Sequence, residues 1–157
     1  MAQVFRYTYL LALVLWIGGI VFFSFLASPS IFKILPREQA GQVVSDIFPK
    51  YNLLGYIACA VALGSLFGLR QLDVAQSVRT AMIFLVVMGG IQVTMGTVIG
   101  PMVIEARDAV KAATAGPKKD RLEKRFGVLH GVSMLLNLTL LILGLVLLHR
   151  VSVHLQL

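Results

Sequence analysis

The amino-acid sequence predicts an all-α membrane protein, a bundle of four transmembrane helices formed by a single integral membrane domain over residues 1–157. Hydrophobic residues make up 58% of the chain and charged residues only 13%, which is about half the charged fraction of a typical soluble domain. A chain of this length cannot bury so much apolar surface in a core surrounded by water, so lipid must cover the excess. The apolar residues form four long runs, and a helix pairs every backbone N–H and C=O within such a run.

The four predicted spans cover about residues 7–27, 51–69, 78–100 and 127–148. Each is close to the ~20 residues that cross a hydrocarbon core of about 30 Å. The first run is longer than the apolar part of a cleaved signal peptide, so we expect it to be a retained helix.

A short amphipathic helix is predicted in the first loop, over residues 37–48. We expect Pro29 and Pro36 to break the chain after the first span, and Pro49 to end the short helix. The apolar residues between these prolines follow the spacing of one helical face, at Ala40, Val43, Val44, Ile47 and Phe48. Because this stripe is too short to cross a bilayer, the helix is expected to lie parallel to the membrane.

A protruding helical hairpin is predicted between the third and fourth spans. Residues 105–125 hold seven Lys or Arg and four Asp or Glu, yet their apolar residues keep helical spacing. Gly116 and Pro117 mark the turn, since Gly favours the end of one helix and Pro the start of the next. We expect both arms to be continuous with the adjoining spans.

The distribution of basic residues predicts the orientation. Ten of the 14 Lys and Arg residues lie in the first and third loops, and four lie on the other side. This bias predicts that loops one and three are cytoplasmic and that both termini are outside. The bacterial cytoplasmic membrane is the expected location. Because the basic residues flank apolar runs, the net charge of +7 suits anionic lipid headgroups, and nucleic acid is not expected as a partner.

Intramembrane polar residues give the candidate site. His130, Ser133 and Asn137 share one face of the fourth span, and Gln92 is the one amide of the third. Polar groups in hydrocarbon seek partners, so we expect Gln92 and Asn137 to pair, with His130 close by. Trp16 lies mid-span in the first helix and should face the bundle. These five residues either hold the helices together or line a small polar pocket.

A metal or heme site has weaker support. His130 could ligate heme iron, but bis-histidine ligation needs a second histidine at similar depth. No CxxCH or HExxH motif is present, and Cys59 is the only cysteine, so no metal site or cofactor is expected. No Asp, Glu, Lys or Arg lies in the middle of a span, which argues against proton-driven transport.

Small residues form two stripes of GxxxG type. They are Ala60, Gly64 and Gly68 in the second span, and Gly96 and Gly100 in the third. This spacing lets two helix backbones approach closely. The stripes therefore serve packing within the bundle, or contact with a membrane-protein partner or a second copy of the chain.

Several segments along the chain together suggest a family. They are Trp16-Ile17-Gly18-Gly19, Leu35-Pro36-Arg37, Phe48-Pro49-Lys50-Tyr51, and Arg125-Phe126-Gly127-Val128-Leu129-His130-Gly131 with Asn137-Leu138. In this pattern the chain resembles the transmembrane-protein-205-like membrane proteins, whose biochemical function is unknown. More distantly it is similar to the copper-resistance-protein-D-like superfamily, which includes a four-helix heme-binding oxidase. Those heme enzymes keep a histidine in the first span, where this sequence has Tyr7 and Tyr9.

Three functions are compatible with these observations. The first is a small non-enzymatic membrane protein that binds an apolar or amphipathic ligand inside the bundle. The second is an accessory subunit of a larger membrane complex, docked through the small-residue stripes and the charged hairpin. The third is a heme or redox protein that uses His130.

Overall fold

The computed structural model describes residues 1–72 and 78–154, and within these residues every regular element is helical. In chain order the elements are α1 (Ala2–Val21), η1 (Phe22–Ala27), α2 (Ser28–Ile34), α3 (Arg37–Gln71), α4 (Val78–Thr94), η2 (Met95–Ile99), α5 (Gly100–Ala112) and α6 (Pro117–His154). They join into four continuous rods, each long and apolar enough to cross a membrane. The predicted fold class is therefore confirmed, and the chain is an integral membrane protein.

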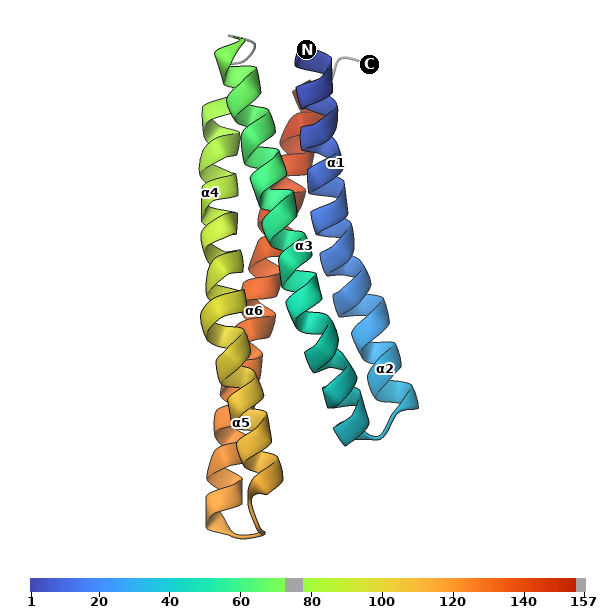
Figure 1. Cartoon of the computed structure of the whole chain (residues 1–157), viewed down its shortest axis with the longest axis vertical. Helices are drawn as coiled ribbons and strands as arrows, with labels where there is room; N and C mark the ends of the chain where they lie inside the picture. Colours follow the sequence, from blue (N-terminus) through green and yellow to red (C-terminus); the bar gives the residue numbers. More distant parts are fainter. Residues whose placement is uncertain (73–77, 155–157) are drawn as a thin grey trace.

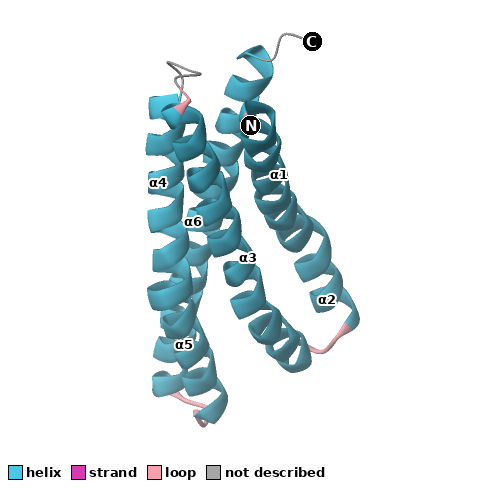
Figure 2. Cartoon of the chain, turned by 45° about the horizontal axis from the view of Figure 1, so that its top comes forward, coloured by secondary structure: helices cyan, strands magenta, loops and turns pink. Residues whose placement is uncertain are grey.

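The four rods run up and down as antiparallel neighbours (Figure 1). The start of α1, the end of α3, the start of α4 and the end of α6 lie at one end of the bundle. The α2–α3 and α5–α6 turns lie at the other. α1 packs on α3, α3 on α4, and α6 on α1, α4 and α5. Toward the two turns, the α2–α3 pair diverges from the α5–α6 pair (Figures 1 and 2).

The tightest packing lies in the half of the bundle that holds the chain ends. There the side chains of α1, α4 and α6 interdigitate and are almost completely buried, as for Leu13, Trp16, Ile20, Leu85, Met88, Leu140 and Leu147. Most other apolar side chains point outward, which is the expected pattern for rods surrounded by lipid.

The prediction that Pro49 ends a short separate helix is wrong. Residues 37–48 are helical, but they form the first third of α3, which continues through Pro49 to Gln71. They therefore extend the second span and do not form an independent helix parallel to the membrane. Neighbouring helices let a membrane helix tolerate the proline. Pro49 itself is exposed, while the rings of its neighbours Phe48 and Tyr51 pack with Phe23 of η1, with the Phe23 and Tyr51 centroids 5.1 Å apart.

The prediction that Pro29 breaks the chain is also wrong, because α1, η1 and α2 form one rod that ends before Pro36. The π-helical turn η1 explains the difference. The Ser28 N–H donates to the Phe23 carbonyl, five residues back, and this wider turn directly precedes the proline. The same arrangement recurs in the third rod, where the Gly100 N–H donates to Met95 in η2, just before Pro101.

The predicted hairpin is confirmed. α5 ends at Ala112, α6 begins at Pro117, and the turn between them includes Gly116 at φ 139°. A side chain at that φ would be strained, so glycine is required for the turn. α3 has 35 residues, which is about 52 Å of helix and far more than a ~30 Å hydrocarbon core. The rods therefore extend beyond the membrane.

The small-residue stripes serve contacts within the chain at three positions. A Cβ at Gly68 would meet the Phe5 ring, one at Gly96 would meet Tyr56, and one at Gly100 would approach Phe48. Gly64 has no such neighbour and is exposed. Of the two stripes, only the part around Gly64 stays uncovered.

Candidate functional site

A cleft of about 800 Å³ occupies the half of the bundle in which the rods diverge. Its walls come from the second half of the first rod, the start of α3, η2 with α5, and the first half of α6. The lining is mainly apolar, with a few polar side chains placed among aromatic and aliphatic ones. The polar lining residues are Ser24, Ser28, Ser45, Arg107, His130, Ser133 and Asn137.

A hydrogen-bond network closes one end of the cleft, the end that lies near the middle of the rods. The Tyr51 hydroxyl donates to Asn137 Oδ1 at 2.6 Å, and Asn137 Nδ2 donates to Ser24 Oγ at 2.8 Å. These two hydrogen bonds join α3, α6 and η1. Because an amide and two hydroxyls at membrane depth need partners, the contacts also explain why three polar side chains converge there.

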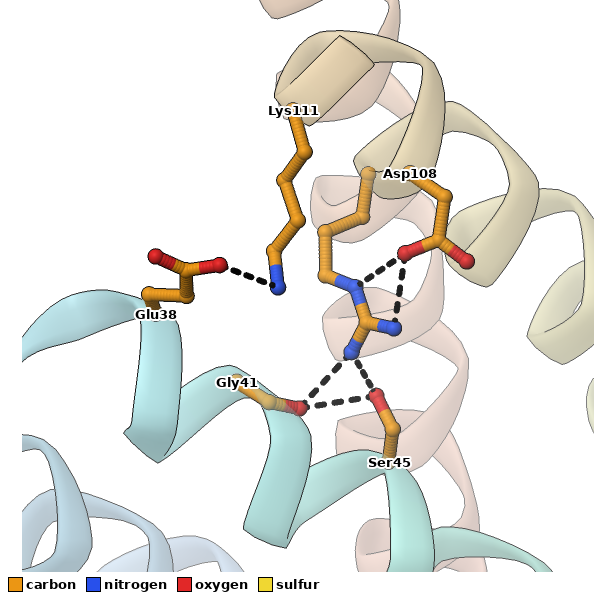
Figure 3. Close-up of polar contacts among 6 residues, drawn as sticks. Glu38, Gly41, Ser45, Asp108 and Lys111 are labelled. Atoms are coloured by element: carbon orange, nitrogen blue, oxygen red, sulfur yellow. Dashed lines mark hydrogen bonds and ion pairs between the residues drawn. The ribbon is translucent and has the colours of Figure 1, made fainter.

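A second polar cluster, which we call the clasp, bridges α3 and α5 at the other end of the cleft (Figure 3). Arg107 Nη1 donates to the Gly41 carbonyl at 2.8 Å and to Ser45 Oγ, while its Nε and Nη2 donate to Asp108 Oδ1. Lys111 Nζ lies 3.3 Å from Glu38 Oε1. Long side chains of α5 therefore reach across to the first turns of α3.

Both π-helical turns contribute to the walls of the cleft. η1 supplies Phe23, Ser24 and Phe25, and η2 supplies Met95. A π turn rotates the following side chains relative to an α-helix, and such turns occur frequently at functional sites. Their presence in two facing rods at this position favours a role for the cleft beyond packing.

Three of the five predicted site residues line the cleft together: His130, Ser133 and Asn137. They lie on one face of α6, as their spacing indicated. Asn137 is held by the hydrogen bonds described above. The His130 ring is stacked on Phe126, with centroids 5.8 Å apart and planes at 17°, and it is exposed to the open cleft.

The other two predicted residues lie outside the cleft, in the packed half of the bundle. Gln92 and Trp16 are 1% and 2% exposed. Trp16 Nε1 donates to Gln92 Oε1 at 3.3 Å, and Gln92 Nε2 donates to Asn52 Oδ1 at 2.7 Å. The expectation that Trp16 faces the bundle is confirmed, and these contacts hold α1, α3 and α4 together.

The predicted pairing of Gln92 with Asn137 is wrong. α4 turns Gln92 toward α3, where Gly55 leaves room for the amide: a Cβ on Gly55 would lie 2.6 Å from it. Asn137 instead faces η1 and Tyr51. The two amides thus belong to different networks because α4 and α6 direct their polar faces toward different neighbours.

The predicted site did not include Ser24, Ser45, Tyr51 or Arg107. Ser24 could have been recognised, because a serine in an apolar run needs a hydrogen-bond partner. Ser45 lies on the polar face of residues 37–48, and Arg107 follows the third span, where it resembles a solvated headgroup-level charge. Their convergence depends on α3 running straight through Pro49, which the sequence rules did not predict.

The cleft offers hydrogen-bonding and aromatic contacts more than metal ligation. Among the described residues, no group of three or more His, Cys, Asp or Glu side chains could hold a metal ion. Of the described residues that line the cleft, His130 is the one that carries an imidazole. Any second protein ligand to a heme at His130 would therefore have to be a different side chain, such as the thioether of Met95 or Met134.

Comparison with known proteins places the chain in a family. Residues 11–112, more than half of the chain, match the family described as "Domain of unknown function (DUF4149)", and the chain belongs to that family. An uncharacterized protein of Aquifex aeolicus (strain VF5) is 46% identical over 54 residues, which are 34% of this chain and 39% of that protein. The match thus covers well under half of the relative's length. No solved structure matches the chain.

Proposed function

We propose that this membrane protein binds one small apolar or amphipathic molecule in the cleft and is not an enzyme. The observation that carries the proposal is the cleft itself. Its volume of about 800 Å³ is in the range of ligand sites, ~300–1,000 Å³. Its mainly apolar lining with a few polar groups is also typical of such sites. Of the seven polar lining side chains, Ser28, His130 and Ser133 form no side-chain hydrogen bond to another rod within residues 1–72 and 78–154, so they are available to a ligand.

The proposed topology places the cleft toward the cytoplasm. The excess of Lys and Arg in the first and third loops supports an orientation with both termini outside, in the bacterial cytoplasmic membrane. The cleft lies in the half of the bundle near those loops, so a ligand's polar group would sit near the cytoplasmic headgroups. The resemblance to the transmembrane-protein-205-like proteins is part of this proposal, and His130, Gly131 and Asn137 of its motif line the cleft.

A matched pair of glycine variants tests the proposal. Gly131 lines the cleft and is exposed, and a Cβ there meets no atom within 4 Å, so Gly131→Trp should fill the cleft without disturbing the helix. Gly127 is one turn earlier on α6, is equally open, and is not among the lining residues. Gly127→Trp is therefore the control.

Both variants and the unmodified protein would be purified in mild detergent and analysed by native mass spectrometry and solvent extraction. We expect a stoichiometric small molecule in the unmodified protein and in Gly127→Trp, and its loss from Gly131→Trp. Retention of the molecule by Gly131→Trp, or its absence from all three proteins, would contradict the proposal. A co-purifying polypeptide in place of a small molecule would support the accessory-subunit alternative. A Soret band lost in His130→Ala would support the heme alternative.

A further inference from the structure

The positive charge at the cleft is already engaged by the protein. A guanidinium has five N–H groups, and four hydrogen bonds are formed by Arg107: two to Asp108 Oδ1, at 3.0 and 2.9 Å, one to the Gly41 carbonyl and one to Ser45. The adjacent carboxylate also cancels the charge. The remaining N–H of Arg107 is on Nη2, beside the Asp108 carboxylate, so an anion at Arg107 would meet a charge that is already neutralised. Among the described residues that line the cleft, Arg107 is the one Lys or Arg.

The other polar side chains that a ligand can reach are hydroxyl, amide and imidazole groups. Ser28 and Ser133 have hydroxyls at the cleft wall, and Asn137 has one amide N–H beyond the one it donates to Ser24. In its neutral form, the His130 imidazole has one donor and one acceptor. Hydroxyl, amide and imidazole groups suit carbonyl and hydroxyl partners. A charged headgroup would lose its hydration in such a site without comparable compensation.

Aromatic rings line opposite walls of the cleft. Phe126 and His130 form a stacked pair on α6, while Phe23 on η1 and Phe48 on α3 lie with their centroids 6.5 Å apart. Aromatic side chains favour offset-stacked or edge-to-face contact with another conjugated ring. A flat ring lying against the Phe126–His130 pair would contact an aromatic face close to Ser133, and an aliphatic chain could extend along the apolar lining toward Phe23 and Phe48.

We propose that the ligand is an uncharged amphiphile with a flat, hydrogen-bonding conjugated headgroup and an aliphatic tail, the chemistry of an isoprenoid quinone. This inference rests on the proposed binding function and narrows its ligand class. Ser133 and His130 hydrogen-bond the ring substituents, Phe126 packs on the ring, and the tail extends along the cleft past Phe23 and Phe48 toward lipid. Arg107 holds the wall together and does not bind the headgroup.

Three probes separate the parts of this proposal: decylubiquinone, which is flat and uncharged; dioctanoylglycerol, which is uncharged but not flat; and dodecanoate, which is anionic. Binding to the full chain in detergent would be measured by native mass spectrometry or thermophoresis, with Gly131→Trp as the cleft-blocked reference. We expect decylubiquinone to bind at least about tenfold more tightly than dodecanoate, the difference that one lost charge-assisted contact produces. Dioctanoylglycerol should bind between the two.

A charge-release variant provides the second test. Asp108 is exposed, with 56% of its side chain accessible, so Asp108→Asn should fold while freeing Arg107 for an anion. Dodecanoate affinity should rise by about tenfold, and decylubiquinone affinity should stay unchanged. Asp120→Asn, an exposed position on the same hairpin, is the control and should change neither.

The outcomes distinguish this inference from the proposed function. Dodecanoate binding to the unmodified cleft as tightly as decylubiquinone would overturn the uncharged-ligand inference while leaving a binding cleft. Equal binding of dioctanoylglycerol and decylubiquinone would overturn the flat headgroup. An unchanged dodecanoate affinity in Asp108→Asn would contradict the role given to Asp108. If no probe binds and no molecule co-purifies with the unmodified protein, the proposed function itself fails.

Discussion

The Tyr51 hydroxyl donates a 2.6 Å hydrogen bond to Asn137 Oδ1 across 86 positions of sequence. The contact joins the second rod to the fourth at the point where the cleft begins. Asn137 also donates a hydrogen bond to Ser24 on the first rod. From this level toward the start of α1 the rods pack closely, and toward the α2–α3 and α5–α6 turns they diverge. A polar contact at membrane depth thus lies at the boundary between the two halves of the bundle.

Tyr51→Phe should destabilise the protein by about 1 kcal/mol, because it leaves Asn137 Oδ1 without its donor while retaining the ring that stacks on Phe23. The measurement is the free energy of unfolding in detergent. Tyr7→Phe is the control, since Tyr7 is 65% exposed. Equal stability of the two variants would show that the Tyr51–Asn137 bond contributes nothing.

Glycines on the third rod make a second, purely steric prediction. A Cβ at Gly96 would clash with the Tyr56 hydroxyl, whereas one at Gly90 meets no atom within 4 Å. Gly96→Ala should therefore cost about 1–3 kcal/mol through overpacking. Gly90→Ala should be neutral or stabilise the helix by up to about 1 kcal/mol. Thermal unfolding of both variants in the same detergent tests this; a Gly96→Ala protein as stable as Gly90→Ala would contradict the close packing of α3 on η2.

Sequence reasoning predicted the parts of this fold that depend on local pattern. Hydropathy marked the four rods, and the Gly116–Pro117 pair marked the hairpin turn, because each signal lies within one segment. The rules on proline failed at Pro29 and Pro49. Whether a proline ends a helix depends on contacts between rods and on the turn before it. Here these are the π turn η1 before Pro29 and the packing of Phe48 and Tyr51, which flank Pro49, on Phe23, and neither is visible in a local window.

The candidate site was predictable to the extent that it lies on one helix. The spacing of His130, Ser133 and Asn137 places them on one face whatever the neighbours are. Their partners come from other rods, and choosing among them requires the rotation of each helix about its own axis. Gln92 was assigned to Asn137 because each is an intramembrane amide, yet α4 is rotated so that Gln92 meets Asn52 and Trp16.

The clasp should control the mobility of the start of α3. Arg107→Gln removes the bonds to Gly41 and Ser45, so residues 37–48 lose their main tie to α5. Backbone hydrogen exchange in this segment should become about tenfold faster, as expected for loss of roughly 1.4 kcal/mol of local stability.

Glu38→Gln is the control. Its ion pair with Lys111 is exposed, with 70% of the Glu38 side chain accessible, and surface pairs contribute about 0–1 kcal/mol. Unchanged exchange in Arg107→Gln would mean that α3 is held by other contacts.

The last prediction concerns orientation. The start of α1 and the end of α6 lie at one end of the bundle and the α5–α6 turn lies at the opposite end (Figure 1), so probes at the two ends must be on opposite sides of the membrane. Cys59 is the only native cysteine and is buried, and Cys59→Ala provides a thiol-free background. Gln3→Cys and Ala115→Cys then place single thiols at exposed positions. Position 116 is avoided because its φ of 139° disfavours a side chain.

Since ten of the 14 Lys and Arg residues belong to the first and third loops, a membrane-impermeant maleimide added to intact cells should label Gln3→Cys but not Ala115→Cys. Permeabilised cells should label both. The reverse pattern would place the cleft toward the outside and would remove the cytoplasmic leaflet as the source of its ligand. Labelling of both thiols in intact cells would indicate that the protein inserts in both orientations. The ten-to-four distribution of Lys and Arg residues predicts a single orientation.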